Sequence, residues 1–161
     1  MSENIAALPF EAAEYERRVA GARARMAERG IDLLIVTGAE NGYYLSGLLV
    51  GTPQVFLALV LPIEGAACWV VRQTELSNVR TMAATSWVKE GVGVPDEADP
   101  IDILAGYLRE RGAERARIGV ERQGWFFHAD YQHRLAAALA EATFLDSTGL
   151  VEGMRNVKGP A

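Results

Sequence analysis

Few residues in this 161-residue chain have types and spacings that could carry out chemistry. The two histidines, His128 and His133, lie five positions apart, so a helix would separate them by about 140° instead of pairing them as metal ligands. His128 and Asp130 could act as a base and its orienting carboxylate, a spacing that is common by chance. Cys68 lies inside an apolar run, where a cysteine usually behaves as a small hydrophobic residue. A small independent enzyme using His128, Asp130 or Cys68 is therefore the least favoured hypothesis.

Other catalytic patterns are equally weak. The sequence contains no G-x-S-x-G nucleophile motif and no glycine-rich phosphate loop followed by lysine. Four carboxylates, Asp96, Glu97, Asp99 and Asp102, could gather a hard metal ion. Their positions also fit a loop and the first turn of a helix, where acidic side chains cap the backbone and favour the helix dipole. The capping interpretation accounts for all four of them.

Arg72 and Glu75 allow two interpretations, because they lie where a buried strand is expected to end and a helix to begin. The favoured one is a structural pair at the start of the helix. In the other, Arg72 anchors the carboxylate of a substrate, since a guanidinium can donate two parallel hydrogen bonds to a carboxylate.

The composition indicates one soluble globular domain. Half of the residues are hydrophobic, 23% are charged and the formal net charge is −5, which excludes a disordered chain and gives no basic patch for nucleic acid. A single cysteine excludes a disulfide framework and fits a reducing, cytoplasmic compartment. Residues 1–10 lack the features of a signal peptide. The uncharged stretch 41–63 is interrupted by glycine and proline, so no membrane helix is expected.

The elements that must position these residues follow a repeated pattern of helix, glycine and strand. An amphipathic helix over 11–29 ends at Gly30 and leads into a buried strand over 31–37. A second helix begins with Asp99 and Pro100, ends at Gly112 and leads into a strand over 117–121. Two such units predict an α/β layered fold.

Further elements make the predicted sheet mixed. A hairpin is expected between them, with a turn at Gly65. The glycines between 38 and 51 suggest a long connection, and residues 92–99 suggest a loop. The remaining predictions are hairpin strands over 55–61 and 66–72, a weak helix over 73–84, a short strand over 86–90, a helix over about 128–142 and a strand over 143–146.

Three segments in order resemble the N-terminal domain of the creatinase/prolidase family, the "pita-bread" metallohydrolases that include Xaa-Pro peptidases. Tyr15–Thr37 is similar to the family's first helix and strand. Asn41–Gly47 (NGYYLSG) resembles its Asn-x-x-Tyr-Leu-(Ser/Thr)-Gly segment, and an apolar hairpin with Arg72-x-x-Glu75 follows. Gly153–Pro160 (GMRNVKGP) is similar to the Arg-x-x-Lys-x-Pro segment before the catalytic domain. The resemblance covers nearly the whole chain.

The resemblance implies a single three-layer α/β domain with a mixed sheet flanked by helices, similar to ribonuclease H. Residues 1–150 would form this domain, and 151–161 would begin the linker to a catalytic domain that lies beyond this chain. The expected partners are that C-terminal catalytic domain and a second copy of the full-length enzyme. The chain itself would hold no catalytic residue, metal or other cofactor. Two divalent metal ions would belong to the catalytic domain, where metal-activated water attacks an amide carbonyl.

The resemblance also implies that the loop from Tyr43 to Gln54 faces the substrate. Candidate substrate-binding residues are Tyr43, Tyr44, Val50, Thr52 and Arg72. Creatinases carry an aromatic residue and an arginine where Val50 and Thr52 stand, so creatine is not the expected substrate.

The favoured function is therefore that of a non-catalytic domain that shapes the substrate site and mediates dimerisation in an Xaa-Pro dipeptidase or aminopeptidase. The alternatives are the same domain of a creatinase or a related amidohydrolase acting on a small cyclic or N-substituted amino acid, and a free-standing module that binds a small ligand or a partner.

Overall fold

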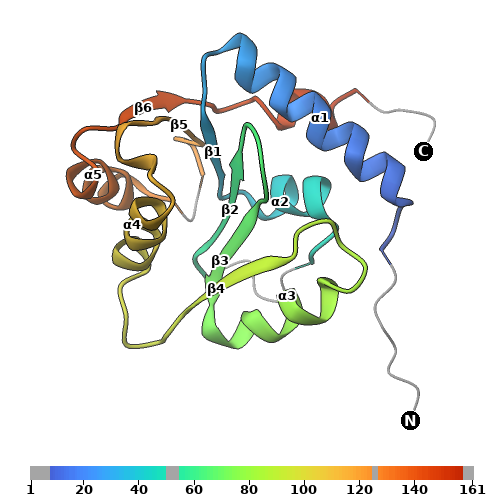
Figure 1. Ribbon diagram of the computed structural model, residues 1–161, viewed down its shortest axis with the longest axis horizontal. Helices are drawn as coiled ribbons and strands as arrows, with labels where there is room; N and C mark the ends of the chain where they lie inside the picture. Colours follow the sequence, from blue (N-terminus) through green and yellow to red (C-terminus); the bar gives the residue numbers. More distant parts are fainter. Residues whose placement is uncertain (1–7, 50–54, 125–126, 158–161) are drawn as a thin grey trace.

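The computed structural model describes residues 8–49, 55–124 and 127–157, in which six strands form one mixed sheet (Figure 1). The strand order is β4-β3-β2-β1-β5-β6. The strands are β1 (Leu33–Val36), β2 (Leu57–Pro62), β3 (Cys68–Arg72), β4 (Glu90–Val94), β5 (Arg117–Val120) and β6 (Thr143–Asp146). The helices are α1 (Ala12–Glu28), α2 (Ala39–Ser46), α3 (Leu76–Met82), α4 (Pro100–Glu110), α5 (Ala129–Ala138) and α6 (Glu152–Arg155), with short 3-10 turns at Gln73–Glu75 and Ala113–Arg115.

The pairing of the strands confirms the mixed sheet and the hairpin. β2 pairs antiparallel with both β1 and β3, while β1 with β5, β3 with β4, and β5 with β6 are parallel pairs. Leu33 of β1 lies opposite Pro62 on one side and Ile118 on the other. β1 is thus a central strand, and its four residues are all buried, as expected for a strand covered on both faces.

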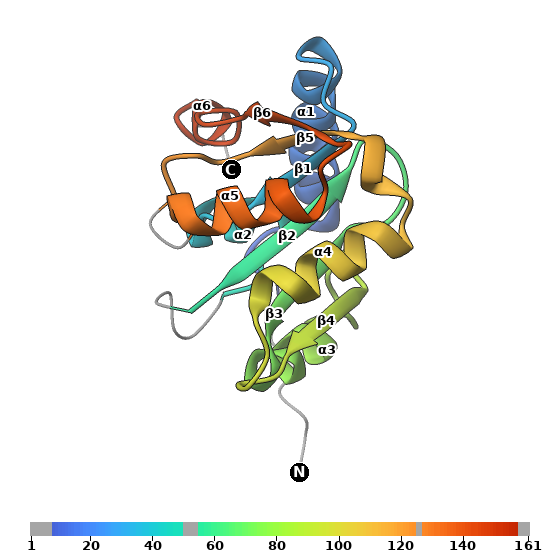
Figure 2. The ribbon, with the colours of Figure 1, turned by 90° about the vertical axis from the view of Figure 1, so that its left-hand side faces the viewer.

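Alternate residues of the strands point into two separate cores, which makes the domain three-layered. Leu34 and Val36 join α1, α2 and α3 in one core, and Leu33 and Ile35 join α4 and α5 in the other. Figure 2 shows α4 and α5 on the face of the sheet turned toward the viewer, with α1 behind it. The three-layer α/β fold expected from the sequence is confirmed.

Two helices begin or end as their residue types predict. Gly30, after α1, has φ +65°, a conformation that side chains other than glycine rarely adopt. At the start of α4, the Asp99 side chain accepts hydrogen bonds from the backbone N–H groups of Ile101 and Asp102, and Pro100 occupies the first helical position. These local signals determine where α1 ends and where α4 begins.

Three segments differ from the sequence-based expectation. The long connection after β1 contains the helix α2. The strand expected over 86–90 begins only at Glu90 and continues to Val94, into the first residues of the segment 92–99 that was predicted as a loop. The last predicted helix stops at Ala138. The helix α6 lies within residues 151–157 and packs against α1 and α2, and the start of a linker over 151–161 stays a prediction.

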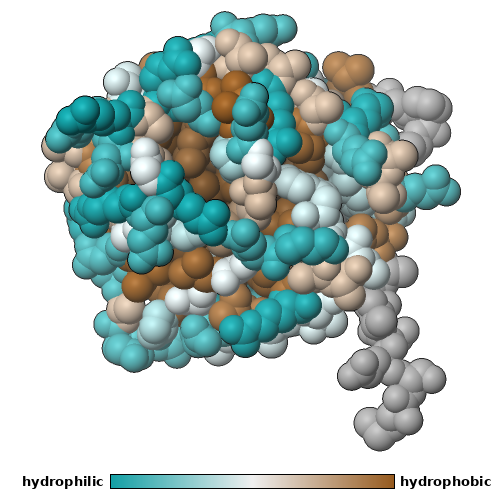
Figure 3. Space-filling view, in the orientation of Figure 1, coloured by the Kyte–Doolittle hydropathy of each residue, from teal (hydrophilic) through white to brown (hydrophobic). Residues whose placement is uncertain are grey.

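The surface mixes hydrophilic and hydrophobic residues. On the face shown in Figure 3, hydrophobic patches lie between larger hydrophilic areas. Among the described residues, Leu49 and Val157 are the large hydrophobic side chains that are most exposed, at 73% and 75%. No helix within the described ranges is both long and apolar enough to span a membrane.

Candidate functional site

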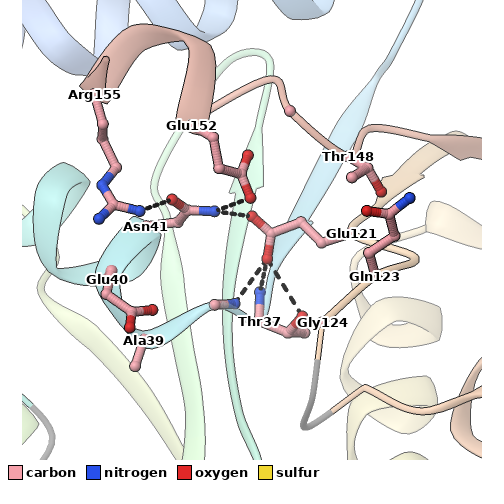
Figure 4. A pocket seen from close by; sticks show the side chains of 12 residues that line it. Thr37, Ala39, Glu40, Asn41, Glu121, Gln123, Gly124, Thr148, Glu152 and Arg155 are labelled. Atoms are coloured by element: carbon pink, nitrogen blue, oxygen red, sulfur yellow. Dashed lines mark hydrogen bonds between the residues drawn. The ribbon is translucent and has the colours of Figure 1, made fainter.

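A polar cavity of about 370 Å³ lies at the carboxyl ends of β1 and β5 (Figure 4). The chain leaves β1 through α2 toward β2, and leaves β5 through α5 toward β6 on the opposite side. Such a divergence of two parallel strands is where open α/β sheets usually place their binding crevices. The cavity is lined by Thr37, Gly38, Ala39, Glu40, Asn41, Glu121, Gln123, Gly124, Thr148, Gly149, Glu152 and Arg155.

Glu121 is the buried carboxylate of this cavity, with only 4% of its surface exposed. Its Oε2 accepts hydrogen bonds from the backbone N–H groups of Thr37 and Gly38, both at 2.7 Å, where the chain enters α2. Burial raises the pKa of Glu121, and these N–H groups together with Asn41 oppose that shift. The donors at the start of α2 that could hold an external anion are therefore already bound to a carboxylate of the chain itself.

Asn41 connects three segments through its side-chain amide. Its Nδ2 donates to Glu121 Oε1 at 2.6 Å and to Glu152 Oε1 at 2.9 Å. Its Oδ1 accepts from Arg155 Nη1 at 2.9 Å. Both amide hydrogens and the amide oxygen thus have partners, on β5's carboxyl end and on α6 (Figure 4).

The cavity holds more negative than positive charge. Glu40, Glu121 and Glu152 contribute carboxylates, and Arg155 contributes a guanidinium. Glu152 Oε2 is buried without a hydrogen-bond partner among the described residues. No group of three or more His, Cys, Asp or Glu side chains in the described ranges is arranged to hold a metal ion. The visible role of these residues is to join β1, β5, α2 and α6.

Tyr43 and Tyr44, two of the predicted substrate-binding residues, lie on α2 rather than on an irregular loop. Both are partly buried. The Arg18 guanidinium lies 4.3 Å from the centre of the Tyr44 ring and donates to the Tyr44 carbonyl at 3.0 Å. The orientation of this part of α2 is therefore set by α1. Val50 and Thr52, the next two predicted residues, lie outside the described residues.

Arg72, the last of the predicted substrate-binding residues, does not line this cavity. Its Nε donates to Asp96 Oδ1 at 2.7 Å, and both side chains are exposed. Glu75 instead accepts from Asn78, so the expected pairing of Arg72 with Glu75 at the helix start is not formed. The Arg72–Asp96 pair borders a shallower hollow of about 200 Å³ beside Phe56.

The residues considered for independent catalysis are not brought together. His128 precedes α5 and stacks on Tyr131, with ring centres 4.0 Å apart. Asp130 lies 3.6 Å from the guanidinium of Arg134. Cys68 is 1% exposed and burial raises the pKa of its thiol, so the reactive thiolate is disfavoured.

Sequence reasoning did not single out Glu121 or Glu152, and it included Asn41 and Arg155 only as parts of motifs. One signal was present: Glu121 ends an apolar strand, and a carboxylate carried into a core needs hydrogen-bond partners. Its partners come from positions 80 or more residues away, so the sequence alone could not name them.

Comparisons with known proteins agree with this architecture. The model of the creatinase/prolidase N-terminal domain matches residues 18–157. Ectoine hydrolase from Halomonas elongata is 31% identical over 160 residues, which cover 95% of this chain and 40% of that protein. Dipeptidase PepE from Mycobacterium ulcerans superposes with a TM-score of 0.71 at 27% identity, over 94% of this chain and 39% of the other.

A third relative is itself an isolated domain. The N-terminal domain of an Xaa-Pro dipeptidase from Lactobacillus brevis matches with a TM-score of 0.72 at 19% identity, over 85% of this chain and 99% of that one, which shows a common fold. The chain thus spans about two fifths of the length of the ectoine hydrolase and the M. ulcerans dipeptidase, and nearly all of an N-terminal domain. Because the family model matches most of its length, this chain belongs to the creatinase/prolidase N-terminal domain family.

Proposed function

We propose that this chain is the non-catalytic N-terminal domain of a metal-dependent hydrolase of the Xaa-Pro dipeptidase or aminopeptidase type, where it shapes the substrate site. The observation that carries the proposal is the family match over residues 18–157. The chain covers only about two fifths of the ectoine hydrolase and of the M. ulcerans dipeptidase, which are longer proteins. The divalent metal ions and the hydrolytic step belong, in this proposal, to a C-terminal catalytic domain.

The residues proposed to face the substrate are Tyr43 and Tyr44 on α2 and Arg72 at the end of β3. An exposed ion pair such as Arg72–Asp96 contributes only about 0–1 kcal/mol. Arg72 can therefore leave Asp96 at little cost and bind a substrate carboxylate. Val50 and Thr52 remain predictions from the resemblance, and Thr52→Arg is expected to change substrate preference in the full-length enzyme.

A second candidate is the N-terminal domain of an amidohydrolase acting on a small cyclic amino-acid derivative. The similarity to ectoine hydrolase favours it, because that alignment covers 95% of this chain. In both candidates the substrate is a small molecule with a carboxylate and a hydrolysable carbon–nitrogen bond, so the same proposed residues would contact it.

We further propose that the full-length enzyme is a cytoplasmic homodimer. Leu49, which is 73% exposed just after α2, supports an interface beside the proposed substrate residues. The mass of the full-length protein in solution, measured by light scattering for the native sequence and for Leu49→Ser, tests this. A monomeric native protein would contradict it.

The function is tested with the full-length protein loaded with divalent metal and assayed on Xaa-Pro dipeptides and on ectoine. Hydrolysis that is lost on chelation and restored by metal supports the proposal, and the preferred substrate decides between the two candidates. Absence of hydrolysis of either class would refute it.

The role of Arg72 is tested by Arg72→Met, with Arg115→Met as the matched control. Arg115 likewise pairs with a carboxylate, that of Glu141, and its side chain is more exposed than that of Arg72. Arg72→Met is expected to raise KM by about tenfold, the effect of losing one interaction worth about 1.4 kcal/mol, while Arg115→Met leaves KM unchanged. Equal KM values in both variants would remove Arg72 from the substrate site.

A further inference from the structure

We propose that Asn41 is a positioning residue that fixes α6, the last described helix, against α2, which carries Tyr43 and Tyr44. The inference rests on the proposed function for its kinetic consequence, while its structural part stands on the contacts of this chain. Asn41 itself is 3% exposed, and its amide uses both of its donor hydrogens and accepts one hydrogen bond at its oxygen.

Asn41 makes two hydrogen bonds to α6. Glu152 and Arg155 lie three positions apart, on one face of this short helix. Glu152 accepts from the amide nitrogen of Asn41, and Arg155 donates to its oxygen. The planar amide is therefore held at both ends, so α6 cannot rotate about its axis without breaking a charge-assisted hydrogen bond.

The far end of α2 is fixed independently. The carbonyl of Tyr44 accepts from Arg18, that of Leu45 from Trp87 Nε1 at 2.7 Å, and that of Ser46 from Ser86 at 3.1 Å. With its last carbonyls bound in this way, α2 behaves as a rigid piece between α6 and the proposed substrate residues. We expect a displacement of α6 to pull on Asn41 and to tilt α2 about these bonds, which would shift Tyr43 and Tyr44 on the same helix.

Because Asn41 donates to two carboxylates, exchanging donors and acceptors in this network gives a direct test, which is read out by hydrogen exchange on this chain. In Asn41→Asp a carboxylate faces the carboxylates of Glu121 and Glu152 in place of the amide that now donates to both. Exchange of the amides of residues 153–156, which bond within α6 and its preceding turn, is expected to accelerate by about tenfold, the effect of losing one charge-assisted hydrogen bond. Exchange in β2 and β3 should not change.

Two further variants control this experiment. Glu152→Gln keeps an oxygen that accepts from Asn41 but makes that bond neutral, so exchange should accelerate less than in Asn41→Asp. The triple variant Asn41→Asp, Glu121→Gln, Glu152→Gln reverses donors and acceptors, because each introduced amide donates to the introduced carboxylate. The oxygen of the amide introduced by Glu121→Gln still accepts from Thr37 and Gly38, so the triple variant should restore slow exchange. Native-like exchange in Asn41→Asp, or no recovery in the triple variant, would overturn the proposal.

Arg155→Met covers the case in which Asn41→Asp fails to fold. It removes only the contact to the Asn41 oxygen and leaves the bonds of Glu121 intact. Faster exchange confined to residues 153–156 supports the proposal, and unchanged exchange there opposes it.

The consequence for the substrate residues is tested by kinetics in the full-length enzyme. Asn41→Asp should raise KM by about tenfold, equivalent to about 1.4 kcal/mol, with kcat less affected, and the triple variant should restore KM. Ile101→Val, in the core on the opposite side of the sheet, is the control for general destabilisation and should leave KM unchanged. If α6 loosens but KM does not change, the coupling to Tyr43 and Tyr44 is refuted. If the native enzyme hydrolyses nothing, the proposed function fails while the exchange result still stands.

Discussion

Arg18 offers the most direct test of how α1 holds α2. Its side chain is 9% exposed, and its Nε donates to Glu14 Oε1 at 2.7 Å. Its Nη1 donates to the Tyr44 carbonyl at 3.0 Å, and its Cζ lies 4.4 Å from the centre of the Phe10 ring and 4.3 Å from that of Tyr44. The perturbation is Arg18→Lys, which retains the positive charge and removes the planar fork.

The expected magnitude follows from the contacts that a lysine cannot make. The arginine reaches Glu14 and the Tyr44 carbonyl from two different nitrogens of its planar fork. We expect a lysine ammonium to lose one of these bonds, and a hydrogen bond from a charged donor contributes about 1.5–3 kcal/mol. A guanidinium stacked on an aromatic ring contributes about 0.5–1 kcal/mol or more when it is desolvated. Arg18→Lys should therefore lower the free energy of unfolding by about 2–4 kcal/mol. In a domain of this size that lowers Tm by roughly 4–16 °C.

Arg17 provides the matched control, because it binds the same Glu14 carboxylate but is 62% exposed at its side chain. Arg17→Lys should change the stability by less than about 0.5 kcal/mol. Urea unfolding of the three proteins, followed by tryptophan fluorescence, measures both differences. Equal losses in the two variants, or a loss below about 0.5 kcal/mol for Arg18→Lys, would refute the argument that burial makes this guanidinium important.

Three further predictions concern packing, pH and metal. Gly42→Ala should lower stability by about 1–2 kcal/mol, despite the better helix propensity of alanine, because its Cβ would lie 2.5 Å from the buried Trp69 ring. Gly106→Ala on α4 should be stabilising, because the added Cβ meets nothing within 4 Å. Thermal unfolding of the two variants compares these effects. Hydrogen bonds from Arg17 and Arg18 lower the pKa of Glu14 from 4.5 to about 2, so its contribution is present above pH 4.5 and is lost as the pH falls toward 2. Glu14→Gln should therefore flatten the acid side of the stability profile, and an unchanged profile would contradict this. A chelator should leave the Tm of the 161-residue chain unchanged; a fall reversed by added metal would reveal a site that the described residues do not show.

The helix α2 shows why part of the fold could not be predicted. Asn41 and Gly42 together are a strong turn signal in sequence, yet both lie within a helix. Gly42 is tolerated there because its missing side chain allows the helix to lie against Trp69. The side chain of Asn41 is occupied by Glu121 and α6 instead of competing for the local backbone. Tertiary contacts thus overrode a local preference.

β4 is a second case of the same kind. Gly91 and Gly93 gave the segment the composition of a loop, although it pairs with β3 along its length. A Cβ on Gly91 would lie within 2.9 Å of Val79 and Leu76, so α3 can pack over the strand only because glycine stands there. By contrast, the helix ends at Gly30 and Asp99 depend on local chemistry and were predictable from single residues.

The central pairing of β1 with β5 also has a consequence for how the chain folds. β1, β2 and β3 follow one another as antiparallel neighbours, whereas the contact between Asp32 and Arg117 beside the β1–β5 pair joins residues 85 positions apart. Closing that long segment costs more chain entropy than forming the three-strand meander. The meander is therefore expected to be largely formed in the rate-limiting transition state, with β5 and β6 docking afterwards. Destabilising changes in the meander should then slow folding, while those around β5 and β6 should mainly accelerate unfolding.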